Sequence, residues 1–320
     1  MRNIFIETLI KLAEKDNRIL LLTADLGYTV IEPFAEKFPQ RFFNVGVAEQ
    51  NMVGMSTGLA QAGFIPFLYS INNFVSIRPY EFIRNGPILH QLPVRIIGVG
   101  GGFDYGSAGV THYGLEDIGL MRLQKGIGVV VPADRNQTQA ALLKTWDLPG
   151  PVYYRLGKGN KNSIDGLNGR FDFGGLQHIR QGNDFVFISI GSITQEVVSA
   201  ADQLEQKGIS ASIVVVSSFN PSPTTDLIKI LKKFPLAITV EDHYVTGGVG
   251  SFVAEVVAEN NISCQIKRCA VDTLIPNVTG SREFMNSHYG ISAAKLVEIA
   301  WHCLRNDKFT LSKADLFLEK

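Results

Sequence analysis

The stretch Asn44-Val-Gly-Val-Ala-Glu49-Gln-Asn-Met52 decides how this chain folds, because it joins an apolar run to a segment rich in small residues at 52–62. An apolar run, a glycine and a segment of helical periodicity predict a strand, a turn and a helix. Glu49 lies at the opening of that helix. A carboxylate there can complement the helix dipole, or it can be a buried acid that shares a proton with a ligand nitrogen. The spacing alone does not choose between these two roles.

Strands and helices alternate on either side of this stretch. Apolar runs predict strands at 19–23, 42–45, 65–69, 94–99, 128–131 and 152–155. Helical periodicity predicts helices that include 50–62, 79–90 and 136–146, and charges at helical spacing predict an amphipathic helix within 1–18. This alternation is typical of a parallel sheet that helices cover on both faces.

A second cycle of the same kind follows. It predicts strands at 185–190, 213–216 and 237–241 and helices at 194–207, 224–233 and 251–260. Between the cycles lies a segment rich in Gly, Asn, Asp and Lys with little periodicity. We therefore expect two consecutive α/β domains with mostly parallel sheets, at 1–160 and 183–320, joined by a linker and surface hairpin at 161–182.

Composition excludes several classes of function. Apolar residues make up 45% of the 320 residues and charged residues 19%, which is the balance of a globular protein. Thirty basic residues face thirty acidic ones, so no electrostatic footprint for nucleic acid or an anionic membrane is expected. The three cysteines form no Cys-x-x-Cys pair, and we expect them to be buried thiols in a reducing cytoplasm.

The sequence around Glu49 resembles a cofactor motif. A strand, then Gly-[Ile/Val]-x-Glu-[Gln/His], then a small-residue helix is similar to the activating-glutamate motif of the transketolase and deoxyxylulose-phosphate synthase family. In that family the glutamate hydrogen-bonds the aminopyrimidine ring of thiamine diphosphate and helps the cofactor to lose its C2 proton. The task needs an acid in an apolar pocket, because burial favours the protonated carboxyl group. The resemblance implies that Glu49 is catalytic and binds the cofactor.

Two further segments match the family in the same order. The run Thr23-Ala-Asp-Leu26 ends the first strand as the family's Ala-Asp-Leu does, so Asp25 is expected near the cofactor. The run Ser70-Ile-Asn-Asn-Phe74 resembles the aromatic loop that stacks on the pyrimidine, which assigns the stacking ring to Phe74. Another aromatic usually stands where this chain has Ile71, so the expected cofactor pocket is less aromatic here.

The third match bears on the substrate. The run Gly106-Ser-Ala-Gly-Val-Thr-His112 resembles Gly-x-Asp-Gly-x-Thr-His, whose histidine assists proton transfers at the substrate hydroxyls. His112 is therefore expected to be catalytic and substrate-binding. The motif's aspartate, which contacts a sugar hydroxyl in the family, is Ala108 here, and Gly100 to Gly102 stand where a phosphate-contacting histidine is usual. These departures predict a donor other than the usual pentose phosphates.

Two arginines remain at positions that contact phosphate in the family. They are Arg2 and Arg155. Arginine suits a phosphate because its fork donates two parallel hydrogen bonds, although each could equally form an ordinary salt bridge. The resemblance implies that both bind substrate.

The second cycle resembles the C-terminal domain of the family. It contains Thr239-Val-Glu-Asp-His243 and then Gly247-Gly-Val-Gly-Ser251, a glycine turn whose N–H groups could cradle an anion at a helix N-terminus. In the family this element supports packing and subunit contact, so no catalytic role is expected there. The likeness extends from Arg2 to Trp301.

One family element is missing from the sequence. Thiamine-diphosphate enzymes bind the diphosphate and its Mg²⁺ or Ca²⁺ through a Gly-Asp-Gly element on a separate domain, and no Gly-Asp-Gly occurs here. The resemblance therefore implies the C-terminal subunit of a split transketolase, with no metal ligand of its own. A separate N-terminal subunit would carry the diphosphate and metal site, in an α2β2 assembly that acts on small sugar or keto substrates.

The expected reaction is transfer of a two-carbon unit from a ketone donor to an aldehyde or ketone acceptor. Three alternatives remain open at this point. They are a condensation of pyruvate with an aldehyde as in deoxyxylulose-phosphate synthase, the β subunit of a 2-oxo-acid dehydrogenase, and a scaffold subunit without catalysis. Retention of Glu49 and Phe74 argues against the scaffold, because folding needs neither.

Overall fold

The computed structural model describes residues 1–159, 163–273 and 277–305; part of the predicted linker and the end of the chain lie outside these ranges. The helices are α1 Arg2–Ala13, α2 Glu32–Lys37, α3 Glu49–Gln61, α4 Asn72–Ile77, α5 Tyr80–Ile83, α6 Asp117–Leu123, α7 Arg135–Thr145, α8 Thr194–Glu205, α9 Thr224–Leu231, α10 Val249–Glu259, α11 Arg282–His288 and α12 Ala293–Arg305. The strands are β1 Ile19–Thr23, β2 Phe42–Asn44, β3 Ile65–Ile71, β4 Arg95–Val99, β5 Gly128–Val130, β6 Val152–Leu156, β7 Leu176–Arg180, β8 Phe185–Ile190, β9 Ala211–Val216, β10 Ser218–Phe219, β11 Leu236–Tyr244 and β12 Gln265–Val271.

The first sheet has the strand order β10-β5-β6-β4-β3-β1-β2, and all its pairs are parallel except β10 with β5. Its central strands β1 and β4 are buried throughout, as their continuous apolar runs require. Ile19 and Leu21 pack with Phe5 of α1, whereas Leu20 and Leu22 pack with Met52 of α3 on the opposite face. Helices therefore cover both faces of the sheet.

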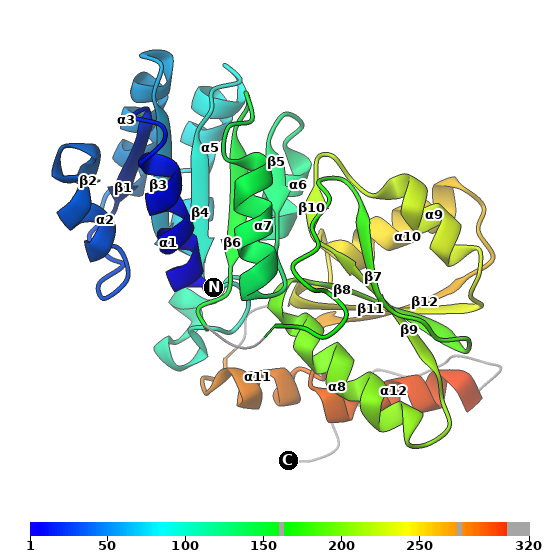
Figure 1. Ribbon diagram of the computed structural model, residues 1–320. Coiled ribbons are helices and arrows are strands. Elements are labelled where there is room, and N and C mark those ends of the chain that lie inside the picture. Colours follow the sequence, from blue (N-terminus) through cyan, green and yellow to red (C-terminus); the bar gives the residue numbers. More distant parts are fainter. Residues whose placement is uncertain (160–162, 274–276, 306–320) are drawn as a thin grey trace.

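The second sheet has the order β12-β11-β8-β9-β7, in which only β7 runs antiparallel to its neighbour. Helices α8 and α12 lie on one face and α9 and α10 on the other (Figure 1). The core around Leu22 and Ile96 continues through Val131 to Val186 and Val249, so one apolar cluster spans both domains. The prediction of two α/β domains with mostly parallel sheets is confirmed.

Three strands were not predicted, and each is an edge strand. Strand β7 lies at the end of the predicted linker and surface hairpin. Strand β12 carries Gln265, Lys267 and Arg268 in place of an apolar run. Strand β10 belongs by sequence to the second cycle but pairs with β5 of the first sheet. Strands β7 and β12 carry polar residues at exposed positions, so they lack the apolar signal of the central strands. Strand β10 is buried but has only two residues, too few for a pattern.

The three cysteines are free and buried, and burial raises the pKa of Cys269 to about 12. Across the ranges that the structure describes, no helix is both long and apolar enough to span a bilayer. The carboxyl ends of β1, β2, β3 and β4 meet at one edge of the first sheet. In open α/β sheets this is the edge where ligands bind.

Candidate functional site

Glu49 lies at that edge as the first residue of α3. The chain leaves β2 at Asn44 and turns at Gly46, whose φ of +73° favours glycine. The Glu49 side chain is only 1% exposed, yet it is not isolated. Its Oε1 accepts from Ser70 Oγ at 3.3 Å, and its Oε2 accepts from Arg78 Nη1 at 2.9 Å. The turn therefore places a buried carboxylate at the sheet edge, with one partner that reaches it from the surface.

Phe74 and His112 lie beside this carboxylate. Phe74 belongs to α4, directly after β3, and the Arg78 guanidinium lies 3.9 Å from the centroid of its ring. The His112 ring meets Phe74 edge-on, with the centroids 5.1 Å apart. The two loops are joined by a hydrogen bond from the Asn73 amide to the Thr111 carbonyl. The structure thus brings together three predicted residues, Glu49, Phe74 and His112, around the side chain of Arg78, which the sequence did not single out.

Asp25 and Ile71 border the same edge. Asp25 is exposed after β1 and accepts hydrogen bonds at 3.0 Å from Asn44 Nδ2 and from Tyr28 Oη. These bonds, that from Asn44 first, lower the pKa of the Asp25 carboxyl below its usual value. Asn44 also accepts from the N–H of Gly46. Because Asp25 holds Asn44, it helps to stabilise the turn that leads to Glu49. Ile71 is half-buried at the end of β3.

Ala108 and the glycine run lie on the loops after β4. Ala108 is exposed in the 3-10 turn Gly106–Ala108. Gly100 has a φ of +81°, and a Cβ there would strike the Tyr105 ring. A Cβ at Gly101 would strike the guanidinium of Arg155. The glycine run leaves no room for a side chain such as histidine, because the chain's own residues fill that space.

Arg155 was expected to contact substrate, and its surroundings differ most from that prediction. Its guanidinium is buried and forms ion pairs with Asp117 at 3.3 Å and Asp242 at 2.9 Å. It also donates to the carbonyls of Gly114 at 3.0 Å and Asp242 at 2.8 Å. Asp117 belongs to the first domain and Asp242 to the second. In this geometry the donors of Arg155 join the two domains and do not face a ligand site.

Further buried polar residues surround Arg155, and the sequence reasoning missed them. Asn72 Nδ2 donates to Asp117 Oδ2 and to Tyr153 Oη, both at 2.9 Å, and Tyr153 Oη donates to Asp117 at 2.8 Å. Burial raises the pKa of Tyr153 well above its usual value. Arg282 pairs with Asp104 at 3.2 Å. No local pattern could have revealed these contacts, because the partners are far apart in sequence.

Arg2 begins α1, and its Nε donates to the Lys158 carbonyl at 3.1 Å. It also lies close to Tyr69, whose pKa burial raises and Arg2 lowers in part. Arg2 therefore remains at the edge of the first sheet, half-buried, with one donor engaged by the backbone.

The second domain holds another buried carboxylate, Glu241. Its oxygens accept from the N–H groups of Val249 at 2.8 Å and Gly250 at 2.9 Å, in the first turn of α10. A Cβ at Gly248 would strike the same carboxylate, which explains the glycine. Burial raises the pKa of Glu241 above its usual value. The group held by this glycine turn is therefore the side chain of the protein's own Glu241.

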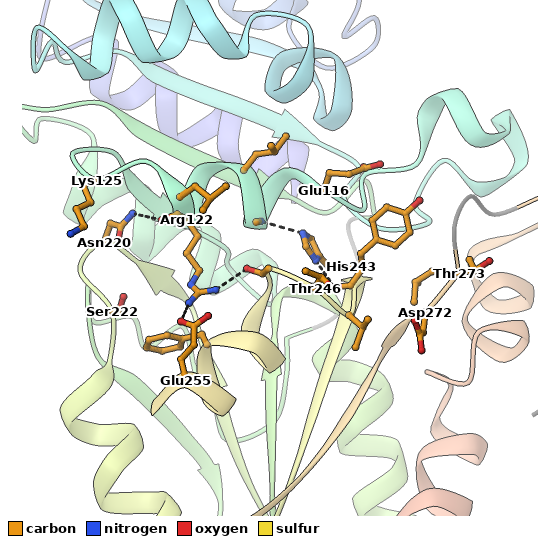
Figure 2. A pocket seen from close by; sticks show the side chains of 18 residues that line it. Glu116, Arg122, Lys125, Asn220, Ser222, His243, Thr246, Glu255, Asp272 and Thr273 are labelled. Carbon is orange, nitrogen blue, oxygen red and sulfur yellow. Dashed lines mark hydrogen bonds and ion pairs between the residues drawn. The ribbon is translucent and has the colours of Figure 1, made fainter. Parts of the chain in front are cut away.

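A cleft of about 880 Å³ lies between the domains, away from Glu49 (Figure 2). The N–H of Gly119 donates to His243 Nε2 at 3.2 Å, and His243 Nδ1 donates to the Tyr244 carbonyl at 2.7 Å. Arg122 donates to the Gly247 carbonyl at 3.1 Å and pairs with Glu255. Burial raises the pKa of Glu116. These polar groups bond mostly to one another across the domain boundary. The residues of this cleft therefore connect the two domains and leave few polar groups available for a reaction.

The edge around Glu49 fits a flat, stacking, hydrogen-bonding group. The planar guanidinium of Arg78 already meets both demands, because it stacks on Phe74 and donates to Glu49. An aminopyrimidine ring makes the same two kinds of contact. Within the described part of the chain, no cluster of three or more His, Cys, Asp or Glu side chains could hold a metal ion.

Comparisons with known proteins match both domains. Residues 1–163 match the family of the transketolase pyrimidine-binding domain, and residues 174–296 match the transketolase C-terminal domain. A Methanocaldococcus jannaschii protein assigned as a transketolase C-terminal section is 35% identical, over 93% of this chain and 94% of its own. One of the subunits of an apulose-4-phosphate transketolase from Actinobacillus succinogenes is 32% identical, over 94% of this chain and 97% of its own.

A solved structure agrees with these matches. It is described as a split-gene transketolase in an inactive β4 tetramer, and it superposes with a TM-score of 0.86 at 32% identity, over 96% of this chain and 99% of that one. A 1-deoxy-D-xylulose-5-phosphate synthase from Heliobacterium modesticaldum is also 32% identical over 93% of this chain, but that match spans only 46% of the synthase. The relatives of the same length are thus transketolase subunits or sections.

Proposed function

This chain belongs to the transketolase family, and we propose that it is the C-terminal subunit of a split transketolase that acts only with a separate N-terminal subunit. It would use thiamine diphosphate to transfer a two-carbon unit from a ketone donor to an aldehyde or ketone acceptor. The observation that carries the proposal is the arrangement at the sheet edge, where a buried carboxylate, an aromatic ring and a histidine meet. The buried cysteines suit a reducing cytoplasm.

The cofactor, when bound, supplies an electron sink for cleavage and formation of the carbon–carbon bond. The chain's residues would hold its pyrimidine half. Phe74 offers a ring face for stacking, and Glu49 offers a buried carboxyl that can pass a proton to a ring nitrogen. His112, at the tip of the next loop, would exchange protons with substrate hydroxyls. Asp25 and Ile71 would border the ring, with Asp25 holding the turn before Glu49.

The surface around Glu49 has the features of an interface with a partner subunit. Helix α3 packs against α5, and α4 packs against the turn that carries His112. Large apolar side chains on these elements and their loops are exposed: Val47, Met55, Ile77, Phe82 and Val110. Exposed apolar side chains gathered around a polar site are typical of an interface. The partner would cover this surface and bring the diphosphate and its Mg²⁺ or Ca²⁺, and two such pairs would make an α2β2 assembly.

The substrate would differ from a classical pentose phosphate. Ala108 presents a methyl group where the family places a carboxylate, so a donor hydroxyl there would find no acceptor. The direct phosphate contact proposed for Arg155 would first require its pairs with Asp117 and Asp242 to open. Arg2, with one donor engaged by the Lys158 carbonyl, is the better candidate for an anionic end of the substrate.

Reconstitution tests the proposal. The chain alone should bind thiamine diphosphate weakly and show no turnover. With the subunit that carries the Gly-Asp-Gly element, calorimetry should show Mg²⁺-dependent binding, and a coupled assay with a panel of ketose donors should show turnover. Tight, Mg²⁺-dependent binding by the chain alone would contradict a split site. A stable complex that binds no cofactor would indicate a scaffold subunit.

A further inference from the structure

Arg78 contacts both Glu49 and Phe74, yet the proposed function gives it no role. Its Nη1 lies 2.9 Å from Oε2 of Glu49, and its guanidinium carbon lies 3.9 Å from the centroid of Phe74. The guanidinium is therefore held between the acid and the ring that are proposed to hold the cofactor. The Arg78 side chain is 40% exposed, whereas that of Glu49 is 1% exposed.

The chemistry of this contact is opposite to what the cofactor requires. A guanidinium only donates hydrogen bonds, so Glu49 must accept from Arg78. A pyrimidine ring nitrogen accepts, so Glu49 must donate a proton to it. A pyrimidine ring that bonds to Glu49 and also stacks on Phe74 needs the position that the guanidinium holds between them. Arg78 and the pyrimidine ring therefore exclude one another.

Resting on the proposed function, we propose that Arg78 is a placeholder: in the cofactor-free chain it occupies the position between Glu49 and Phe74 that the aminopyrimidine ring would take, and it withdraws when the cofactor binds. Its presence keeps the buried carboxylate of Glu49 paired, since a buried charge without a partner is strongly destabilising. Its withdrawal frees Glu49 to change from hydrogen-bond acceptor to donor.

The side chain of Arg78 is able to leave. Arg78 directly follows α4, which ends at Ile77, and its long side chain reaches the site from the solvent side. Within the described residues, the bond to Glu49 is the only hydrogen bond that its guanidinium makes. Exposed side chains change rotamer in picoseconds to nanoseconds, so departure needs no movement of the backbone. By contrast, the guanidinium of Arg155 bonds to several buried groups and is fixed.

Arg41 provides a matched control. Its guanidinium lies 4.0 Å from the centroid of Phe38, nearly the same stacking distance, but it donates to the backbone carbonyls of Ala13 and Asp16 and contacts no site residue. Arg41→Ala removes an arginine of equal size from an aromatic ring in the same domain. It should lower stability without changing affinity for thiamine diphosphate.

The experiment is a calorimetric titration of the two-subunit complex with thiamine diphosphate and Mg²⁺, for wild type, Arg78→Ala, Arg78→Gln and Arg41→Ala. A competitor that occupies the site raises the apparent Kd by the reciprocal of the fraction of time that the site is open. We expect Arg78→Ala to bind about tenfold more tightly than wild type. Arg78→Gln can still donate to Glu49 but carries no charge, so its affinity for thiamine diphosphate should lie between those of wild type and Arg78→Ala. It provides a second variant if Arg78→Ala folds poorly.

The outcomes separate the inference from the proposed function. If wild type binds the cofactor but both Arg78 variants bind it equally or more weakly, Arg78 is not a placeholder. The same conclusion follows if cofactor affinity is unchanged and only the KM of a substrate rises, because Arg78 then contacts substrate. If the wild-type complex binds no thiamine diphosphate, the proposed function itself fails and the inference fails with it.

Discussion

Two buried glutamates, one in each domain, lie close to the first turn of a helix and yet are held in different ways. Glu241 accepts from two backbone N–H groups of α10, those of Val249 and Gly250. Glu49, at the start of α3, accepts from the side chains of Ser70 and Arg78. Both carboxylates are almost fully removed from solvent. Burial alone therefore does not distinguish them, and the difference lies in their partners.

Backbone N–H groups at a helix start cannot leave without unfolding the turn, so the partners of Glu241 are permanent. The guanidinium on Glu49 reaches in from the surface and can be exchanged for another donor or acceptor. A buried acid with permanent partners stabilises a fold, whereas one with an exchangeable partner is available to a ligand. The same reasoning separates Arg155, which is fixed between Asp117 and Asp242, from Arg78.

The largest expected effect is on the activity of Glu49→Gln. The amide cannot pass on the proton that the cofactor needs, so kcat of the reconstituted enzyme should fall about 10²- to 10⁴-fold. Deuterium exchange at the cofactor C2, followed by quenched NMR, should slow in parallel while the complex still assembles. Glu241→Gln is the matched control, and its exchange rate per folded site should equal that of wild type. Wild-type exchange in Glu49→Gln would make Glu49 a helix-terminal acid like any other.

The second expected effect concerns the choice of donor substrate. Ala108→Asp restores an acceptor for a sugar hydroxyl, and such a contact is worth about 1–3 kcal/mol, or roughly ten- to two-hundred-fold in discrimination. The kcat/KM for xylulose 5-phosphate should rise by about that factor relative to a donor without the hydroxyl. Ser107→Asp, on the neighbouring exposed position of the same turn, is the control and should change little. If the wild type already prefers xylulose 5-phosphate and Ala108→Asp brings no gain, Ala108 does not select the donor.

The third effect is on stability and belongs to the second domain. Glu241→Gln offers one acceptor where two N–H groups need one each, so the free energy of unfolding should fall by about 1–3 kcal/mol. Urea denaturation of the full chain measures it. Glu298→Gln is the control, because Glu298 forms an exposed pair with Lys295 and should contribute less than about 1 kcal/mol. Equal losses in the two variants would mean that the contact with α10 adds nothing to the fold.

Most of the fold could be predicted from sequence because the central strands are buried on both faces. Their apolar runs mark them without ambiguity, and 19–23 and 185–190 coincide with β1 and β8. The edge strands β7 and β12 escaped prediction because their exposed side carries polar residues. Strand β10 could not be predicted because two residues form no pattern and its partner, β5, belongs to the other half of the chain.

The same limit applies to the site: residues in short local motifs could be predicted, whereas contacts between distant residues could not. Glu49, Phe74 and His112 stand in short runs with characteristic neighbours, and the structure brings them together. Their assigned roles remain predictions. Pairings between distant residues cannot be seen in a run of letters, so the sequence did not reveal that Arg78 covers Glu49. It also placed Arg155 at a substrate, although its donors join the domains.

The smallest expected effect is the pH dependence of the stability that Glu241 contributes. Burial raises the pKa of Glu241 above the ordinary value of 4.5, so the folded protein keeps this proton to a higher pH than the unfolded chain does. A state that binds more protons loses stability as pH rises, so the contribution of Glu241 is full below pH 4.5 and declines as pH rises through the folded pKa. Glutamine has no proton to lose. The difference in free energy of unfolding between wild type and Glu241→Gln should therefore narrow as the pH rises above about 4.5. Urea denaturation at several pH values measures this difference. A gap that widens with pH would mean that the two N–H groups of α10 outweigh burial and hold Glu241 ionised.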